Sequence, residues 1–374
     1  MKKKLLIITA NDFLVYQPTI LNIYDSLKDY FDASIISFEP KYIGKEKDYS
    51  RNVKYLKIPF RKFLQDCDYS IFLFLKAIKK IFGKEITYDY WLSKKIQFLI
   101  LRNAVQKAKT DIVLAVDTIA LYLAQQKTDS CHFISLEIYQ DDPFRQKIDL
   151  SKVSSVVIQN QMRYDYIFGS LQLKTFFIQN APTYIEGVDN ARQKGLIWAG
   201  SIVKKFAVIE CLDFIKEYPQ YNITLKGGGE QKTIEYIKEN YKELISSANI
   251  KIDQEYLESS AFIRYLSQFK VGFCFYEWDL ISNSINYQTA PSGKLFMYLA
   301  AGVPVIACNI PGFYFVKEFN AGILIDDYSP TTIKNAIDEI ENNYDQFKIG
   351  SKKAAFYFSF DKSVKPYVEY LLEQ

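Results

Sequence analysis

Residues 290–306, which read APSGKLFMYLAAGVPVI, decide the fold. Pro291 and Ser292 are typical of a helix start, with Ser292 as the expected N-cap, and Gly302 predicts where that helix ends. The apolar run after Gly302 predicts a buried strand. Free amides at a helix N-terminus attract anions, and Lys294 adds a full positive charge there. The stretch therefore predicts an anion site that suits the diphosphate of a sugar nucleotide.

Two further glycine loops are expected at the same sheet edge. Gly200 and Ser201 follow a predicted strand at 196–199, and KGGGE at 226–230 follows a predicted strand at 222–225. Glycine permits positive φ and close backbone approach, so its amides can face an oxyanion. Ligands of open parallel sheets lie beyond the carboxyl ends of the strands. An ordinary turn at Gly200 and a flexible connection at the triple glycine are the alternatives.

Short β-rich runs alternate with helical stretches along both halves of the 374 residues, which is typical of α/β domains with parallel sheets. The length suits two domains. We expect an N-terminal domain at 1–185, a C-terminal domain at 186–355 that carries the predicted diphosphate site, and a helical tail at 356–374 that packs on the first domain. The predicted fold is two Rossmann-like, doubly wound domains that face each other across a cleft.

The composition excludes several classes of protein. The 5 cysteines are scattered, which argues against a disulfide framework or a zinc site and favours a reducing compartment. The 1 histidine, His132, excludes multi-histidine metal centres. The apolar stretch at 69–82 is broken by lysines and is too short to span a membrane. The apolar run after the basic N-terminus fits a buried first strand better than a signal peptide. We expect a cytoplasmic protein.

Positive charge is concentrated in residues 54–109, which hold 13 Lys and Arg against 4 Asp and Glu. Such a region invites an anionic partner. Its mixture of basic, aliphatic and aromatic residues suits a helix that lies in a membrane interface. Nucleic acid is the competing partner, but no nucleic-acid-binding module is present. A merely solvated helical face is the remaining alternative.

Several motifs resemble the C-terminal domain of GT-B glycosyltransferases, most closely glycosyltransferase family 4 and related bacterial polysaccharide enzymes. The motifs are PSGKLFMYLAAGVPVI at 291–306, Pro311-Gly312, EFNAGILID at 318–326, LIWAGS at 196–201, LKGGGE at 225–230, and the Asn180-Ala-Pro turn. The resemblance covers about 130 residues, 195–326, and is diffuse over the first half. It implies a donor site made of Gly200, Ser201, Lys226, Gly227, Gly228, Glu277, Asn286, Pro291, Ser292, Gly293 and Lys294.

The sequence departs from the family pattern at one point. Family members carry two glutamates eight positions apart, the second of which holds the donor ribose. Thr289 and Met297 stand at these positions here. Recognition of the ribose would then come from Glu277 or Asn286. The family resemblance still implies a retaining outcome more than an inverting one.

On the acceptor side, acidic residues follow predicted strands. Asp117 follows the run 112–116, and Glu137 lies near the end of a strand predicted at 132–138. Both are expected at the cleft, where Glu137 could act as a base or contact the sugar. The loop after the first strand, with Asn11 and Asp12, is expected to approach donor and acceptor. A helix-capping or ion-paired carboxylate is the alternative for Asp117 and Glu137.

Glycosyl transfer also needs positive charge beside the leaving diphosphate. We expect Lys205 and Lys294 to supply it, with Lys226 as a further candidate. No metal and no cofactor are expected. His132, at the beginning of its strand, is expected to pack in the core.

The predicted activity is transfer of a sugar from a UDP- or GDP-sugar to a saccharide or lipid-linked saccharide, in cell-surface polysaccharide or glycan synthesis. The alternative from another class is a non-catalytic nucleotide-sugar-binding partner. A GT-B epimerase is disfavoured by the single histidine. A dinucleotide oxidoreductase is disfavoured because neither half has Gly-x-Gly-x-x-Gly after a strand. A membrane-surface scaffold would bind liposomes without any affinity for nucleotides.

Overall fold

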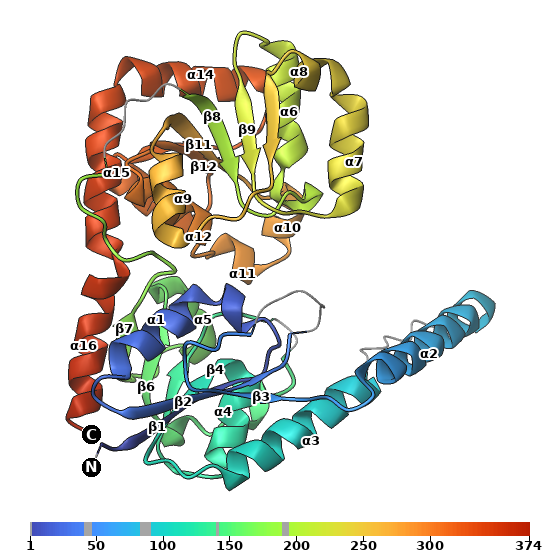
Figure 1. Cartoon of the computed structure of the whole chain (residues 1–374), viewed down its shortest axis with the longest axis vertical. Coiled ribbons are helices and arrows are strands. Elements are labelled where there is room, and N and C mark those ends of the chain that lie inside the picture. The colour runs from blue at the N-terminus through green and yellow to red at the C-terminus, as the bar shows by residue number, and fades with distance from the viewer. Residues whose placement is uncertain (1, 41–46, 83–90, 140–141, 189–193) are drawn as a thin grey trace.

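The computed structural model describes residues 2–40, 47–82, 91–139, 142–188 and 194–374. Within these ranges the chain forms two sheets, and Figure 1 shows them as two lobes, one above the other, each packed against helices. All strand pairs of both sheets are parallel. This is the α/β architecture that the alternation of strands and helices predicts.

The first sheet has the strand order β3-β2-β1-β4-β5-β6-β7. Leu5 and Ile7 of β1 enter one core and Leu6 and Ile8 the other, so both faces are buried, as in a doubly wound sheet. The order reverses between β1 and β4, and this fold holds its ligands at the loops after such strands. The elements are β1 Lys4–Thr9, α1 Pro18–Leu27, β2 Asp32–Phe38, β3 Val53–Leu56, α2 Arg61–Phe82, α3 Trp91–Lys107, β4 Ile112–Val116, α4 Asp117–Gln125, β5 Cys131–Ile134, β6 Val153–Ile158, α5 Gln161–Phe168 and β7 Thr175–Phe177.

The second sheet has the order β10-β9-β8-β11-β12-β13, and its order reverses between β8 and β11. The loops after these two strands begin at Gly200 and Phe275. The elements are β8 Lys194–Ala199, α6 Val208–Glu217, β9 Ile223–Lys226, α7 Gln231–Asn240, α8 Lys242–Ser246, β10 Ile250–Asp253, α9 Ser259–Leu266, β11 Phe269–Cys274, α10 Trp278–Ser282, α11 Ile285–Gln288, α12 Gly293–Ala300, β12 Val305–Cys308, α13 Phe315–Glu318, β13 Gly322–Ile325 and α14 Pro330–Asn342.

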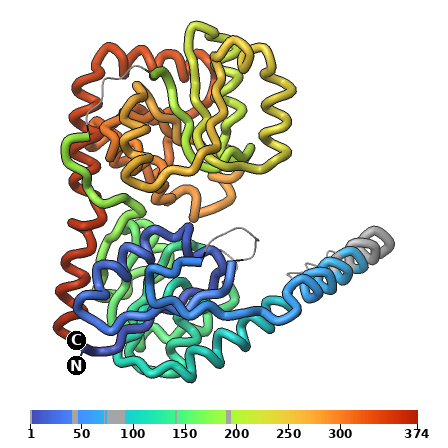
Figure 2. Tube along the Cα trace, viewed as in Figure 1, coloured from blue at the N-terminus to red at the C-terminus, as the bar shows by residue number. Residues whose placement is uncertain are grey.

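The C-terminal segment crosses back from the second sheet to the first, as predicted. Helix α15 (Tyr344–Phe358) packs on the second lobe, and α16 (Phe360–Leu372) lies against α1 and β7. Figure 2 traces this path along one side of the molecule to the C-terminus, which lies beside the N-terminus. Tyr367 is fully buried in the first core, and the Tyr370 hydroxyl donates to the Ser154 carbonyl at 3.1 Å. The tail therefore ties the two lobes together.

Helices α2 and α3 form an arm that projects from the first lobe (Figure 1). The apolar spacing of residues 90–107 predicts a helix there, which matches α3 almost to the residue, but the sequence does not predict the full length of α2. Among the described residues, no helix is both long enough and apolar enough to cross a bilayer. Asp68 of α2 joins the two helices of the arm, because its carboxylate accepts the backbone N–H groups of Leu92 and Ser93 at the start of α3.

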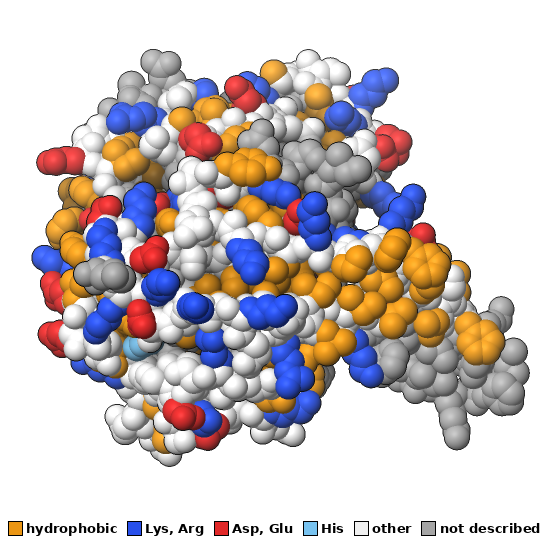
Figure 3. Space-filling model, turned by 60° about the horizontal axis from the view of Figure 1, so that its bottom comes forward, with side chains coloured by type: hydrophobic (Ala, Val, Ile, Leu, Met, Phe, Trp, Pro, Cys, Tyr) orange, Lys and Arg blue, Asp and Glu red, His pale blue; other side chains and the backbone are white. Residues whose placement is uncertain are grey.

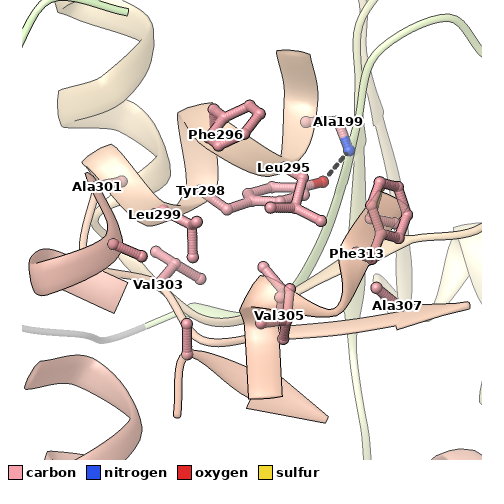
Figure 4. Packing of buried hydrophobic residues seen from close by; sticks show 14 of the residues in the cluster. Ala199, Leu295, Phe296, Tyr298, Leu299, Ala301, Val303, Val305, Ala307 and Phe313 are labelled. Carbon is pink, nitrogen blue, oxygen red and sulfur yellow. Dashed lines mark hydrogen bonds between the residues drawn. The ribbon is translucent and has the colours of Figure 1, made fainter. Parts of the chain in front are cut away.

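Helix α12 is anchored by the core around Tyr298 (Figure 4). The Tyr298 hydroxyl accepts the backbone N–H of Ala199 at 2.6 Å, which ties the helix to the end of β8. The ring lies so close to Gly272 of β11 that an added Cβ would come within 2.8 Å of it. Gly302 ends the helix at φ +64°, as predicted, and Val303 and Val305 turn directly into the core. These contacts fix the N-terminus of α12 against the β8 loop.

Strand β5 ends four residues earlier than predicted. The sequence predicts a strand at 132–138, but the structure ends it at Ile134. The Ser135 carbonyl accepts the Gln159 side-chain amide at 2.6 Å, and the next two backbone N–H groups turn to the carboxylate of Asp117. The side chains of Gln159 and Asp117 thus take the place of a neighbouring strand, because they satisfy the backbone groups that would otherwise bond to that strand. The chain is bent so that Glu137 leaves the sheet.

Candidate functional site

The first two glycine loops pack directly on each other at the edge of the second sheet. Gly200 and Gly227 adopt positive φ of +125° and +139°. A Cβ on Gly227 would lie 2.2 Å from the Gly200 carbonyl oxygen. The Ile202 N–H donates to the Gly228 carbonyl at 2.7 Å, whereas the space around Gly228 itself is open. The triple glycine is therefore a packed loop, which argues against the flexible connection.

The start of α12 is the third part of this site. A Cβ on Gly200 would lie 3.6 Å from Cδ of Lys294, so the helix start adjoins the first loop. Ser292 stands at the N-cap position, but its side chain makes no capping hydrogen bond and instead accepts from the Cys274 thiol at 3.3 Å. A Cβ on Gly293 would lie 3.0 Å from the Asn180 amide nitrogen, so the Asn180-Ala-Pro turn of the first lobe contacts the same helix start.

The Lys294 ammonium is enclosed by aromatic rings. Its Nζ lies 4.6 Å from the ring centre of Trp198, 5.1 Å from that of Phe206 and 5.5 Å from that of Tyr276. The Nζ atom is fully buried and has no hydrogen-bond partner among the described residues. Cation–π attraction offsets part of the cost of removing this charge from water. A buried ammonium with no anion is a site that an oxyanion would complete.

The other two predicted lysines differ in their availability. The buried Lys226 ammonium pairs with Asp253 at 2.6 Å, so it is already neutralised inside the sheet edge. Lys205 is exposed, and its carbonyl accepts the Glu277 backbone N–H at 3.0 Å. Lys205 and Glu277 therefore stand side by side at the loops after β8 and β11, as a cation and a carboxylate on the rim.

In the first lobe, Asp117 stands at the switch point of the sheet, at the first residue of α4. Its backbone φ is +60°, a strained conformation for a non-glycine residue. Its Oδ1 accepts the backbone N–H groups of Leu136 at 2.8 Å and Glu137 at 3.1 Å. Burial raises the pKa of this carboxyl to about 7, against the effect of the two N–H donors. Asp117 thus holds the loop that carries Glu137.

Asn286 of the second lobe joins these residues from the opposite side. Its Nδ2 donates to Oε2 of Glu137 at 2.8 Å, and its Oδ1 accepts from the Ile138 backbone N–H at 3.1 Å. The same oxygen accepts from Nη2 of Arg163 at 3.0 Å. Asn286 therefore bridges the two lobes, in a place where the sequence predicts a contact with the donor ribose.

Arg163 is a functional candidate that the sequence reading missed. It is fully buried, and its Nη2 also donates to the Leu136 carbonyl at 2.8 Å. Burial lowers the pKa of Arg163 to about 10, so it stays charged at neutral pH. A cation in the first turn of a helix, here α5, faces the unfavourable end of the helix dipole. An arginine in the first turn of a helix, just after a strand, is the sequence signal by which Arg163 could have been predicted as a functional residue.

Comparison with known proteins rests on structure alone, because no protein-family profile and no curated protein matches the sequence. HepE from Anabaena, solved with UDP, is 12% identical, covers 100% of each chain and superposes with a TM-score of 0.65. A UDP-forming trehalose-phosphate synthase from Burkholderia vietnamiensis is 10% identical, with 98% coverage of each chain and a TM-score of 0.62. The chain has the GT-B fold.

A third GT-B structure matches over part of its length. The pneumococcal O-GlcNAc transferase GtfA, solved with UDP and GlcNAc, is 14% identical with a TM-score of 0.53. The match covers 78% of the present chain, which spans 62% of GtfA. At these identities the likeness establishes the fold, and the assignment of residues depends on the geometry of this chain.

The remaining predicted residues, Asn11, Asp12 and His132, lie in the first lobe. Asn11 and Asp12 follow β1 at the switch point, where the Asp12 carboxylate pairs with Arg61 at 2.8 Å. His132 is buried in the first sheet with Nδ1 2.8 Å from the Ser155 hydroxyl, and burial lowers its pKa to about 4. Among the described residues there is no cluster of three or more His, Cys, Asp or Glu that could hold a metal.

Proposed function

We propose that the protein is a glycosyltransferase that takes a sugar from a nucleoside-diphosphate sugar and passes it to a saccharide or lipid-linked saccharide, in glycan or polysaccharide synthesis. The observation that carries the proposal is the buried, unpaired ammonium of Lys294 beside two packed glycine loops. Three backbone segments and one cation converge there, which is the chemistry that a diphosphate requires. We therefore propose this edge of the second lobe as the donor side.

The donor side adjoins the acceptor side through a short chain of contacts. The Tyr276 ring lies 5.5 Å from Lys294 Nζ and 5.3 Å from the Tyr287 ring. Tyr287 follows Asn286, whose amide donates to Glu137. A sugar attached to a diphosphate at Lys294 would therefore reach toward Glu137 and Asp117. This proximity supports a transfer reaction over nucleotide storage alone.

In the proposed reaction, the bond from the anomeric carbon to the diphosphate oxygen breaks and a bond to an acceptor hydroxyl oxygen forms. Glu137 takes the proton of that hydroxyl, and Asp117 holds the Glu137 loop. Lys294, the exposed Lys205 and the open amides near Ser201 and Gly228 stabilise the departing diphosphate. The retaining outcome that the family resemblance implies is part of the proposal, and it requires the acceptor hydroxyl to attack the anomeric carbon from the same face that the diphosphate leaves.

We propose UDP as the nucleotide of the donor, ahead of GDP. HepE and GtfA were solved with UDP, and the Burkholderia enzyme forms UDP. Glu277, at the end of the loop after β11, is the remaining candidate for the ribose, because the side chain of Asn286 is held by the first lobe. We also propose domain limits at 1–185, 186–355 and 356–374.

Calorimetric titration with UDP tests the donor site. Lys294→Ala should weaken UDP binding at least about tenfold, because the diphosphate loses its buried cation. Lys216→Ala, an exposed lysine on α6, is the matched control and should bind as the parent protein does. Unchanged affinity in the Lys294 variant would contradict the phosphate assignment. Binding of UDP-sugars with no turnover for any acceptor would favour the non-catalytic binding partner.

A specific surface favours association with the inner face of an anionic membrane, so we propose a cytoplasmic, peripheral enzyme. Figure 3 shows hydrophobic side chains gathered over the arm, beside Lys and Arg. Phe60, Phe63 and Phe74 are 82%, 66% and 65% exposed, and Lys57 and Lys62 are exposed nearby. Apolar side chains among cations suit the headgroup region of a bilayer.

Sedimentation with anionic vesicles tests the arm. A Phe63→Ser/Phe74→Ser variant should pellet less with phosphatidylglycerol vesicles, and UDP binding should not change. The sequence also suggests a test by replacement with Glu of three lysines, Lys76, Lys79 and Lys80. The side chains of these lysines lie outside the described residues. Equal sedimentation of the variant and the parent protein would remove the membrane from the proposal.

A further inference from the structure

The first lobe contains a small cavity beside Glu137 that the proposed reaction does not use. Its volume is about 50 Å³, which exceeds the space of one water molecule and is far smaller than a sugar ring. Glu137 lines the cavity together with Leu121, Phe133 and Ser135. We propose that the cavity receives an acetamido group of the acceptor sugar. The proposal rests on the proposed transfer reaction, because it places the acceptor beside Glu137.

The walls of the cavity are mainly apolar. Leu121 of α4, Phe133 of β5, Ile138 and Ile148 supply much of the lining. Leu121 and Phe133 belong to the buried core of the first sheet, so this wall is fixed by packing. A methyl group would replace water against such a surface and gain free energy from its burial.

One polar group in the wall lacks a partner. Ser135 is 1% exposed, and its hydroxyl has no hydrogen-bond partner among the described residues. Its backbone N–H and carbonyl are both satisfied, by the Val157 carbonyl at 2.9 Å and the Gln159 side chain at 2.6 Å. Ser135 and Phe133 both line the cavity. The hydroxyl is therefore positioned to pair with a ligand atom.

The cavity rim is built by two residues that hold each other. The Thr118 hydroxyl donates to the Asp142 carboxylate, and the other oxygen of Asp142 accepts the Phe144 backbone N–H at 2.9 Å. Arg145 also lines the cavity, but its Nη2 donates to the Tyr166 carbonyl, so its charge is directed to the end of α5. The residues that line the cavity also include the two acidic residues Asp142 and Glu137.

This combination of groups selects one class of substituent. A carboxylate would be repelled by Asp142 and Glu137. A lone methyl group, as in a deoxy sugar, would fill the apolar part but leave the Ser135 hydroxyl unpaired. A hydroxyl group would pair with Ser135 but leave the apolar walls uncovered. An acetamido group has a methyl group for the walls and a carbonyl oxygen that accepts the Ser135 O–H, so it satisfies both.

Binding of simple glycosides tests the proposal without any nucleotide. The methyl glycosides of N-acetylglucosamine and N-acetylgalactosamine are compared with those of glucose and galactose by ligand-observed NMR titration. The better acetamido glycoside should bind at least about tenfold more tightly than its hydroxyl counterpart. Ser135→Ala should reduce that preference about fivefold or more. Ser130→Ala, an exposed serine just before β5, is the control and should keep the full preference.

A second variant separates loss of the pocket from loss of the fold. Leu121→Phe places a larger side chain in the cavity and should abolish the preference; the milder Leu121→Met should keep it. Each variant is accepted only if it still binds UDP as the parent protein does. Equal affinity for acetamido and hydroxyl glycosides, or no binding of either by protein that binds UDP, overturns the proposal. A preference that Ser135→Ala and Leu121→Phe both leave unchanged overturns it as well.

The two proposals fail in different ways. In one outcome, the protein prefers acetamido glycosides and yet binds neither UDP nor any other nucleoside diphosphate. That result would contradict the proposed glycosyltransferase activity and support the proposed acetamido pocket. If the protein binds UDP and transfers sugar to glucosides as readily as to acetamido sugars, the proposed glycosyltransferase activity is supported and the proposed acetamido pocket is contradicted.

Discussion

The proposed donor and acceptor sides of this molecule are built in different ways. On the donor side, the helix start at Ser292–Lys294 belongs to one continuous motif and lies against glycine loops within the same lobe. On the acceptor side, Asp117, Glu137 and Arg163 come from three separate segments, and Asn286 reaches them from the other lobe. Local sequence therefore predicts which groups gather at the proposed donor side, whereas the groups of the proposed acceptor side come together only through long-range packing.

The comparison also separates two ways of holding a charge. Lys294 is buried against aromatic rings and has no hydrogen-bond partner among the described residues, which leaves its hydrogen-bonding capacity unused. Glu137 is exposed but is already held by Asn286 and by the loop on Asp117. A group that binds substrate benefits from hydrogen-bonding capacity that no other residue uses. A group that moves a proton benefits instead from a fixed position. Variants of the two sides should therefore change different measured quantities.

The largest effect is expected on the acceptor side. Glu137→Gln keeps an oxygen that can accept from Asn286 but removes the base, so turnover should fall by a factor of about 10² to 10⁴. UDP affinity should stay within about twofold, because the proposed diphosphate site lies in the other lobe. Initial rates and calorimetry on the same preparation provide both quantities. Full activity in this variant would remove Glu137 from the mechanism.

The donor side should respond in stability when its loops are disturbed. Gly227→Ala places a Cβ 2.2 Å from the Gly200 carbonyl at a φ of +139°, which should cost about 3 kcal/mol of unfolding free energy. Gly228→Ala has open space around the new Cβ and should change it by less than about 0.5 kcal/mol. Urea denaturation measures both. Similar stability of the two variants would show that the loops are not packed as described.

Asn286 distinguishes the two sides most directly. If it bridges to Glu137 and Arg163, Asn286→Ala should lower turnover about tenfold and leave UDP affinity unchanged. If it contacts the donor ribose, UDP affinity should fall by a similar factor instead. Glu277→Gln is the paired variant, for which the opposite pattern is expected. The ratio of the two affinities decides which residue belongs to the donor.

The smallest effect concerns Asp117 and depends on pH. Its pKa is raised from 3.8 to about 7 in the folded protein, so the native state keeps a proton between pH 4 and 7 that the unfolded chain has lost. This group therefore makes the protein less stable as the pH rises through that window. Asp117→Asn removes the effect and can still accept from Leu136. Its unfolding free energy relative to the parent should increase from pH 6 to pH 7, by about 1 kcal/mol.

Most of the fold follows from local sequence signals. The alternation of strands and helices predicts two parallel sheets, and the positions of Gly302 and Val303 predict the end of α12 and the strand after it. The errors lie where side chains from elsewhere compete for backbone groups. Strand β5 ends early because Gln159 and Asp117 take its carbonyl and N–H groups. Such competition depends on contacts across 19 to 24 residues, which no local pattern reports.

For the site, the sequence by itself determined which chemistry is present: glycine loops, a helix start with a lysine, and acidic residues after strands. Those features are local because backbone conformation and helix ends depend on a few neighbouring residues. Only the tertiary structure decided how each side chain is used. It neutralises Lys226 with Asp253, encloses Lys294 in aromatic rings, and gives Asn286 to Glu137 and Arg163. The physical reason is that a charge or amide takes the partner that folding brings within about 3 Å, and that partner is distant in the chain.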